Sequence, residues 1–216
     1  MRPLLIAVLA VATVCSACVD DNPGLVVAGN VRPDSACLFA ATGGALVAYG
    51  IYDVALVHPY FAAPLFRSGL VSRSATEGPP RAEPNDILIE GAVVELTAVD
   101  GSALGVASYS VAMTAFVPTA VDGEPGKASG LVEAIPASVG AELAALTAGA
   151  PTTIVAHMTF FGHTTGGTAI DSNPWSWTLQ VCTGCLQAPC ETLLVNQCFA
   201  GQDGYQYQSA SCPPPV

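Results

Sequence analysis

Residues 86–117 read DILIEGAVVELTAVDGSALGVASYSVAMTAFV, and this stretch decides the fold class. Apolar and polar residues alternate around Gly91 in the segment 86–99, which is the period of a β-strand with one buried face. Gly91 stands where a β-bulge or a strand break fits. Asp100-Gly101 is a turn signal, and the segment 103–117 again has the composition of a strand. The two segments are therefore predicted to form a β-hairpin.

Further segments of the chain also indicate strands, with one short helix among them. Residues 136–138 (PAS) precede this helix, and Ser138 is its expected N-cap. The whole pattern predicts a mainly β protein, an immunoglobulin- or fibronectin-like β-sandwich of about seven strands. The tryptophan and disulfide spacing of a true immunoglobulin domain is absent, so this likeness concerns architecture only. The further predicted strands are 45–57, 129–135, 152–161 and 175–182.

Composition and charge exclude several classes of protein. The chain has 216 residues, a length that suits one domain with or without a small appendage. Hydrophobic residues make up 51% of it and charged residues 11%, which excludes intrinsic disorder. The formal net charge is −11, and Lys and Arg together number six. Phosphate groups bind to clustered positive side chains, so neither nucleic acid nor an anionic lipid surface is an expected electrostatic partner.

The N-terminus has the three-part layout of a secretory signal. Residues 1–3 (MRP) carry a positive charge, an apolar run extends from Leu4 to Val14, and small residues follow at Ser16-Ala17. The apolar stretch 4–19 is shorter than the roughly 20 residues that a helix needs to cross a bilayer. We therefore expect residues 1–17 to be a signal peptide.

The motif Cys15-Ser16-Ala17-Cys18 resembles the lipobox of bacterial lipoproteins. In that family, a cysteine that follows two small residues is acylated and becomes the first residue after cleavage. The family prefers leucine three places before this cysteine, where the present chain has Cys15. The resemblance implies that Cys18 is lipidated and that more than one acyl chain holds the protein on a membrane. The residue after Cys18 is Val19 and not aspartate. In the enteric lipoprotein pattern, the absence of aspartate at this position permits export to the outer membrane.

Ordinary secretion after cleavage at Ala17 is the alternative, and the number of cysteines separates the two interpretations. Cleavage before Cys18 removes Cys15, and acylation uses Cys18, which leaves six of the eight cysteines. An even number suits disulfide pairing in an oxidising compartment, whereas plain secretion or acylation at Cys15 leaves an odd thiol. Lipidation at Cys18 is therefore favoured. The cysteines expected in disulfide bonds are Cys37, Cys182, Cys185, Cys190, Cys198 and Cys212.

The C-terminal segment 182–216 differs in character from the rest of the chain. It holds five cysteines and ends in three prolines and a valine. A segment this short buries little apolar area, so disulfide bonds must supply its order. We expect a disulfide-stapled extension of the last strand. The pairing that we expect, among the many that six cysteines allow, is Cys37–Cys182, Cys185–Cys190 and Cys198–Cys212.

The motif Cys182-Thr183-Gly184-Cys185 is compatible with three kinds of chemistry. A thioredoxin-like redox site places its first cysteine at a helix N-terminus, and Gly184 and Pro189 leave no room for such a helix. A zinc site needs a second close pair of ligands, which the remaining cysteines do not form. Structural disulfides are therefore favoured. The VCxGC pattern, taken with the signal, resembles uncharacterised cysteine-rich lipoproteins of GC-rich bacteria, and this resemblance implies no known activity.

Other residues that could carry chemistry are scattered. His157 and His163 can share one face of a strand, but at about 3.3 Å per residue they stand roughly 20 Å apart, too far to share a metal. Glu90 and Glu95 are expected to be solvent-facing carboxylates. No GxSxG, HExxH, P-loop or GxGxxG motif occurs in the sequence. We therefore expect no catalytic, metal-binding or cofactor-binding residue.

These observations divide the chain into four segments: a signal peptide (1–17), a lipid-anchored linker (18–36), a β-sandwich domain (37–181) and a cysteine-rich extension (182–216). They favour a non-enzymatic lipoprotein that is anchored in the cell envelope, in the outer membrane, by its N-terminal lipid. Such a protein serves as a structural or interaction module, with an envelope protein as its partner. A secreted or periplasmic location is the alternative.

Two other classes of function stay open. The first is an envelope enzyme, either a thiol–disulfide oxidoreductase that uses Cys182 and Cys185 or a hydrolase with a dispersed site. The second is a module that binds a glycan or a metal through loops at one end of the sandwich. For that module, Tyr205 and Tyr207 would be the exposed aromatic residues, but packing in the core or in the disulfide-stapled loops is the favoured interpretation for both.

Overall fold

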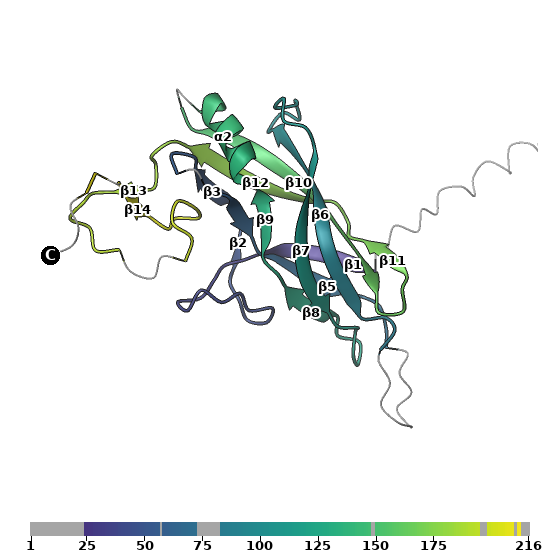
Figure 1. Cartoon of the computed structure of the whole chain (residues 1–216). Helices are drawn as coiled ribbons and strands as arrows, with labels where there is room; N and C mark the ends of the chain where they lie inside the picture. Colours follow the sequence, from purple (N-terminus) through teal and green to yellow (C-terminus); the bar gives the residue numbers. More distant parts are fainter. Residues whose placement is uncertain are drawn as a thin grey trace, which may run out of the picture.

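The computed structural model describes residues 24–56, 58–72, 83–147, 150–194, 198–209 and 211–212. The expected signal peptide and the expected lipidation residue, Cys18, lie outside these residues. Within them the chain is mainly β, as the sequence predicted, with one helix, α2 (Ala137–Leu146). Figure 1 shows two main sheets, with the C-terminal extension at one end of them. No helix among these residues has the length and hydrophobicity to span a bilayer.

The first main sheet is antiparallel and has four strands in the order β2-β1-β5-β8. The second has the order β3-β12-β10-β6-β7, and a short strand, β11, also pairs with β10. The first sheet consists of β1 (Leu25–Val31), β2 (Leu46–Val47), β5 (Pro64–Ser68) and β8 (Gly126–Ser129). The second consists of β3 (Gly50–Asp53), β6 (Ile87–Ala98), β7 (Tyr109–Val117), β10 (Thr152–Thr164), β11 (Ala169–Asp171) and β12 (Trp175–Cys182).

Two small two-stranded sheets complete the β-structure of the described residues. β4 (Tyr60–Ala62) pairs with β9 (Val132–Ile135), and β13 (Gln187–Ala188) pairs with β14 (Tyr207–Gln208). The described strands thus outnumber the expected seven, because several predicted strands are divided and six were not predicted: β1, β4, β5, β11, β13 and β14.

The predicted hairpin is confirmed. β6 and β7 pair from Ile87 opposite Val117 to Val94 opposite Tyr109, and the register shifts between Ile89 and Gly91. A side chain at Gly91 would place its Cβ 2.6 Å from a backbone oxygen of the partner strand, so this bulge requires glycine. β7 begins later than expected because Gly101 and Gly105 adopt positive φ and turn the chain before it.

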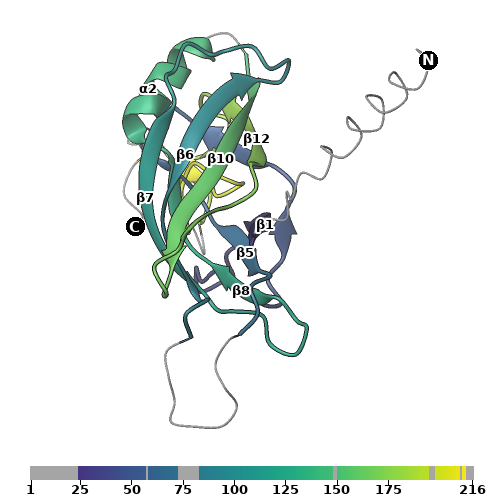
Figure 2. The same cartoon turned by 90° about the vertical axis from the view of Figure 1, so that its right-hand side faces the viewer.

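The two main sheets pack on a common hydrophobic core. Phe66 of β5 and Phe160 of β10 are both fully buried, and their ring centroids lie 5.0 Å apart in an edge-to-face arrangement. Leu25 and Val27 of β1 belong to the same core cluster. Figure 2 shows β1, β5 and β8 beside the long strands β6, β7 and β10.

Three expectations about local structure were wrong. The range 18–36, expected to be a linker, contains β1, which lies between β2 and β5. The range 45–57, expected to be one strand, divides into β2 of the first sheet and β3 of the second. The range 129–135 likewise divides between β8 and β9. In the last two ranges the chain passes from one sheet to another, and hydrophobic periodicity does not reveal such a crossing.

Helix α2 lies at the end of the second sheet where β10 begins (Figure 1). It begins at Ala137, and Pro136 occupies the N-cap position without a side-chain cap, so the predicted cap at Ser138 was wrong. Leu143 is buried in the core. A Cβ at Gly140 would lie 2.0 Å from the hydroxyl oxygen of Tyr52, so the helix approaches β3 closely at a residue without a side chain.

Candidate functional site

Three disulfide bonds join all six cysteines that were expected to pair. The bonds are Cys37–Cys198, Cys182–Cys185 and Cys190–Cys212, so each pairing that was expected from sequence was wrong. β12 ends at Cys182, and the chain makes a tight turn there, so Cys182 is bonded to Cys185, only three residues later. The Cys37–Cys198 bond links residues 161 positions apart and attaches the extension to the loop that follows β1.

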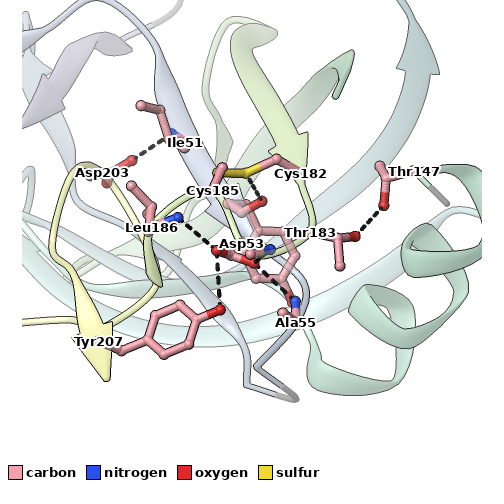
Figure 3. Close-up of a disulfide and its surroundings, with 12 residues drawn as sticks. Ile51, Asp53, Ala55, Thr147, Cys182, Thr183, Cys185, Leu186, Asp203 and Tyr207 are labelled. Carbon is pink, nitrogen blue, oxygen red and sulfur yellow. Dashed lines mark hydrogen bonds between the residues drawn. A yellow bond between two sulfur atoms is a disulfide. The ribbon is translucent and has the colours of Figure 1, made fainter. Parts of the chain in front are cut away.

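The carboxylate of Asp53 holds the turn that contains the Cys182–Cys185 bond (Figure 3). One oxygen accepts hydrogen bonds from the backbone N–H groups of Gly184 at 2.7 Å and Ala55 at 3.0 Å. The other accepts from the N–H of Leu186 at 2.8 Å and the hydroxyl of Tyr207 at 3.3 Å. Asp53 is fully buried, and these four bonds replace the water that its carboxylate loses.

This arrangement of Asp53 and the two sulfur atoms suits structural support better than catalysis. The three residues form a group of potential metal ligands among the described residues, with ligand atoms within 4.8 Å of one another. A disulfide sulfur is not a thiolate, however, and the thiolate is the form that binds metal or attacks as a nucleophile. The carboxylate already accepts four hydrogen bonds. Cys182 is buried and Cys185 is exposed, so one sulfur of the pair lies near solvent.

A second feature, a pocket of about 100 Å³, lies where the extension meets the loop after β1 and the strand β4. Aromatic rings form much of its wall. The centroid of the Phe199 ring lies 5.8 Å from that of Phe39 and 5.5 Å from that of Phe61, with both pairs tilted. Tyr205 adds a fourth partly exposed ring. We call this feature the Phe199 pocket.

Asp203 contributes a carboxylate to the Phe199 pocket and is hydrogen-bonded to the core behind it. It accepts from the N–H of Ile51 at 3.0 Å and from the hydroxyl of Tyr60 at 2.9 Å. Tyr60 in turn accepts a hydrogen bond from the indole N–H of Trp177 at 3.1 Å. Burial raises the pKa of Asp203 to about 6, although these hydrogen bonds and the charge of Arg32 oppose the rise.

Two hydrogen-bond donors also line the Phe199 pocket. Asn30 is 2% exposed, and its side-chain oxygen accepts from the N–H of Ala63 at 2.6 Å. Its NH₂ group makes no hydrogen bond to the described residues. Arg32 is exposed at the rim, and its guanidinium likewise makes no hydrogen bond or ion pair with them. The pocket therefore combines an acceptor and two donors with its aromatic rings.

The Cys37–Cys198 bond holds two walls of the Phe199 pocket together. Phe39 lies two residues after Cys37, and Phe199 directly follows Cys198. Cys37 and Asp203 both adopt left-handed backbone conformations, with φ of 61° and 54°. Such conformations cost free energy in residues other than glycine, so tertiary contacts must hold them.

A second hollow of about 160 Å³ shares Phe61, Phe199 and Gln202 with the Phe199 pocket and is also lined by His58. The Nδ1 atom of His58 lies 2.7 Å from the carbonyl oxygen of Pro59, and since that oxygen can only accept, Nδ1 is the donor of this hydrogen bond. The buried Nε2 atom has no hydrogen-bond partner among the described residues. Gly201 covers it, and a Cβ there would lie 2.6 Å from Nε2.

The structure separates the two tyrosines that were singled out from sequence. Tyr205 lines the Phe199 pocket, whereas Tyr207 is 7% exposed and binds Asp53. Of the histidines, His157 lies within hydrogen-bond distance of two side chains, and His163 lies 3.3 Å from Glu90. The sequence did not point to the pocket, because its residues come from distant segments and carry no local motif.

Comparison with known proteins finds no relative of this chain. The chain matches no family model, and neither a curated protein nor a solved structure is detectably similar to it. The resemblance to cysteine-rich lipoproteins and the immunoglobulin- or fibronectin-like strand order therefore stay predictions.

Proposed function

We propose that this chain is a non-catalytic interaction module that an N-terminal lipid anchors in the bacterial cell envelope. The observation that carries the proposal is the disulfide pattern. All six cysteines from Cys37 onward are paired, which leaves only Cys15 and Cys18 outside the three bonds. Cleavage before Cys18 and acylation of its thiol account for both, so no free thiol is left in the mature protein.

The non-catalytic part of the proposal is supported by the state of the groups that could react. The sulfur atoms of Cys182 and Cys185 are joined to each other, and Asp53 beside them is held by four hydrogen bonds. The role as an interaction module is supported by the Phe199 pocket, where partly exposed rings and unpaired donors lie together. Binding sites combine apolar walls with a few placed polar groups in this way.

Metabolic labelling with radioactive palmitate tests the anchor. Cells that produce the full chain are labelled, and the protein is compared with its Cys18→Ser and Cys15→Ser variants. We expect label in the unmodified chain and in Cys15→Ser, loss of label in Cys18→Ser, and release of the Cys18→Ser variant from the membrane fraction. Label that persists in Cys18→Ser would refute the proposal, and separation of the two membranes on a density gradient tests the outer-membrane location.

A thiol–disulfide oxidoreductase is the second candidate, and one observation favours it. Cys185 is exposed while Cys182 is buried, which is the asymmetry that allows one sulfur of a pair to meet a partner thiol. Alkylation of the native full chain in a glutathione buffer, followed by mass mapping, separates the candidates. We expect all six cysteines to stay protected, whereas selective alkylation of Cys182 and Cys185 would support redox activity.

A further inference from the structure

We infer that the Phe199 pocket is a binding site for a neutral sugar ring, such as a pyranose at the end of an envelope glycan. The inference deepens the proposed function, because it names the chemical class of the partner. It rests on that function, since the anchor in the cell envelope is what brings the pocket to a glycan. The pocket is formed by four segments that are separated in sequence: residues 30–39, Val47 of β2, β4 with its neighbour Ala63, and the extension.

The aromatic walls match the apolar faces of a pyranose. One side of a sugar ring presents C–H groups, and these pack on the face of an aromatic side chain as other apolar groups do. Phe39, Phe61 and Phe199 are each half-buried, so part of each ring is open to a ligand. The hollow beside His58 shares Phe61 and Phe199 with the pocket and gives room for a second sugar unit.

The polar groups match the hydroxyls at the edge of such a ring. A hydroxyl both donates and accepts, so neighbouring hydroxyls need an acceptor and a donor side by side. The Asp203 carboxylate is the acceptor, and the NH₂ group of Asn30 and the guanidinium of Arg32 are the donors. Asn30 keeps its side chain in place through the hydrogen bond that its oxygen accepts from Ala63, so its NH₂ group is a positioned donor.

The charge of the pocket favours a neutral ligand. Arg32 contributes one positive charge and Asp203 one negative charge, so the two nearly cancel when both are ionised. The rest of the chain brings the formal net charge to −11, which repels anionic ligands. A polyhydroxylated ring carries hydroxyls for these two groups and apolar C–H faces for the aromatic rings beside them.

The test uses the full chain, purified in detergent, and saturation-transfer NMR with the methyl glycosides of glucose, galactose, mannose and N-acetylglucosamine. We expect at least one glycoside to bind. Affinity should fall about tenfold in Arg32→Met and in Phe199→Ala, which is the loss of about 1.4 kcal/mol expected for one good contact. Reduction of the Cys37–Cys198 bond should also weaken binding, because that bond holds the two aromatic walls together.

The chain offers matched controls for both substitutions. Arg67 is an exposed arginine of β5 outside the pocket, and Phe116 is a phenylalanine of β7 that is 54% exposed. Arg67→Met and Phe116→Ala should leave the affinity unchanged. Arg32 is exposed and makes no hydrogen bond to the described residues, so Arg32→Met tests binding without disturbing the fold.

Several results would overturn the inference: no binding of any of the four glycosides, equal binding by Arg32→Met and Arg67→Met, or tight binding of glycine in place of a sugar.

The failure of this inference can be distinguished from the failure of the proposed function. Palmitate labelling depends on Cys18 and not on the pocket, and glycoside binding in detergent depends on the pocket and not on the anchor. Each measurement can therefore fail while the other succeeds.

Discussion

The hydroxyl group of Tyr60 donates a hydrogen bond to the carboxylate of Asp203 over 2.9 Å, and this bond joins the core of the protein to its C-terminal extension. Tyr60 is fully buried, whereas Asp203 lines the Phe199 pocket. Burial beside that carboxylate raises the pKa of Tyr60 well above its usual value, so Tyr60 keeps its proton and acts as the donor. The extension is thus bonded into the packed sheets at residues that also form the pocket.

Asp203 should stabilise the fold at low pH and not at high pH, the reverse of what a carboxylate with a lowered pKa contributes. Burial raises its pKa from 3.8 to about 6, so between these values the folded chain holds the proton more tightly than the unfolded chain does. Its contribution to stability is therefore greatest below pH 3.8 and is lost as the pH rises through about 6. The loss is at most about 3 kcal/mol, since one pKa unit corresponds to about 1.4 kcal/mol.

Urea unfolding at pH 4 and pH 7 checks this prediction, with Asp203→Asn as the comparison. Asparagine keeps an oxygen that can accept from Ile51 and Tyr60 but does not ionise. From pH 4 to pH 7 the unmodified chain should lose stability that the variant keeps. The free energy of unfolding of the variant minus that of the unmodified chain should therefore rise between these two pH values. Parallel pH profiles for the two proteins would contradict the assignment.

Replacement of Asp53 by alanine should strongly destabilise the fold. The change leaves the N–H groups of Gly184 and Leu186 without their acceptor, together with the Tyr207 hydroxyl. Each unsatisfied buried group costs about 1–3 kcal/mol, so we expect a loss of at least about 3 kcal/mol in the free energy of unfolding. Asp171→Ala, at an exposed aspartate of β11, should change it by less than about 0.5 kcal/mol. Equal losses in the two variants would refute the role of Asp53.

The three disulfide bonds should contribute unequally to stability. Cys37–Cys198 closes a loop with a sequence separation of 161, and Cys182–Cys185 closes one of only 3. The loop-entropy model gives about 5 kcal/mol for the first and about 2 kcal/mol for the second. Urea unfolding of the two double-alanine variants should show this order, and the reverse order would show that the native contacts of the short loop matter more than loop entropy. Peptide mapping under non-reducing conditions checks the pairing itself.

Removal of the Phe160 ring should leave a cavity between the two sheets. Phe160 is fully buried and meets Phe66 of the opposite sheet edge to face, so Phe160→Ala should cost about 3–5 kcal/mol. Phe116→Ala removes the same group from a residue that is 54% exposed and should cost far less. A loss in Phe160→Ala no larger than that in Phe116→Ala would mean that the sheets do not pack as described.

The fold class could be predicted from sequence because the hairpin at 86–117 has a regular period and a bulge at Gly91. Local patterns did not reveal where the chain leaves one sheet for another, so the range 45–57 was predicted as one strand. β1 was missed since its sequence, LVVAGNV, lacks strict alternation and follows the predicted anchor segment. The predicted role of the extension was sound in general, but its disulfide pairing depends on contacts between distant segments.

The candidate site was harder to predict than the fold. Asn30, Phe61 and Asp203 are ordinary residues in their local sequence, and only the tertiary structure brings them together. Tyr205 was the single pocket residue that sequence reasoning had singled out. Asp53 was missed for the same reason, because its four hydrogen-bond donors come from residues 55, 184, 186 and 207.

The Cys37–Cys198 bond also determines how the molecule responds to tension. A force that pulls the two ends of the chain apart passes along the covalent path from residue 37 directly to residue 198. The 160 residues between them carry no load, so most of both sheets is mechanically shielded while the bond is intact. β1 precedes Cys37 and is the strand that such a force would peel away first.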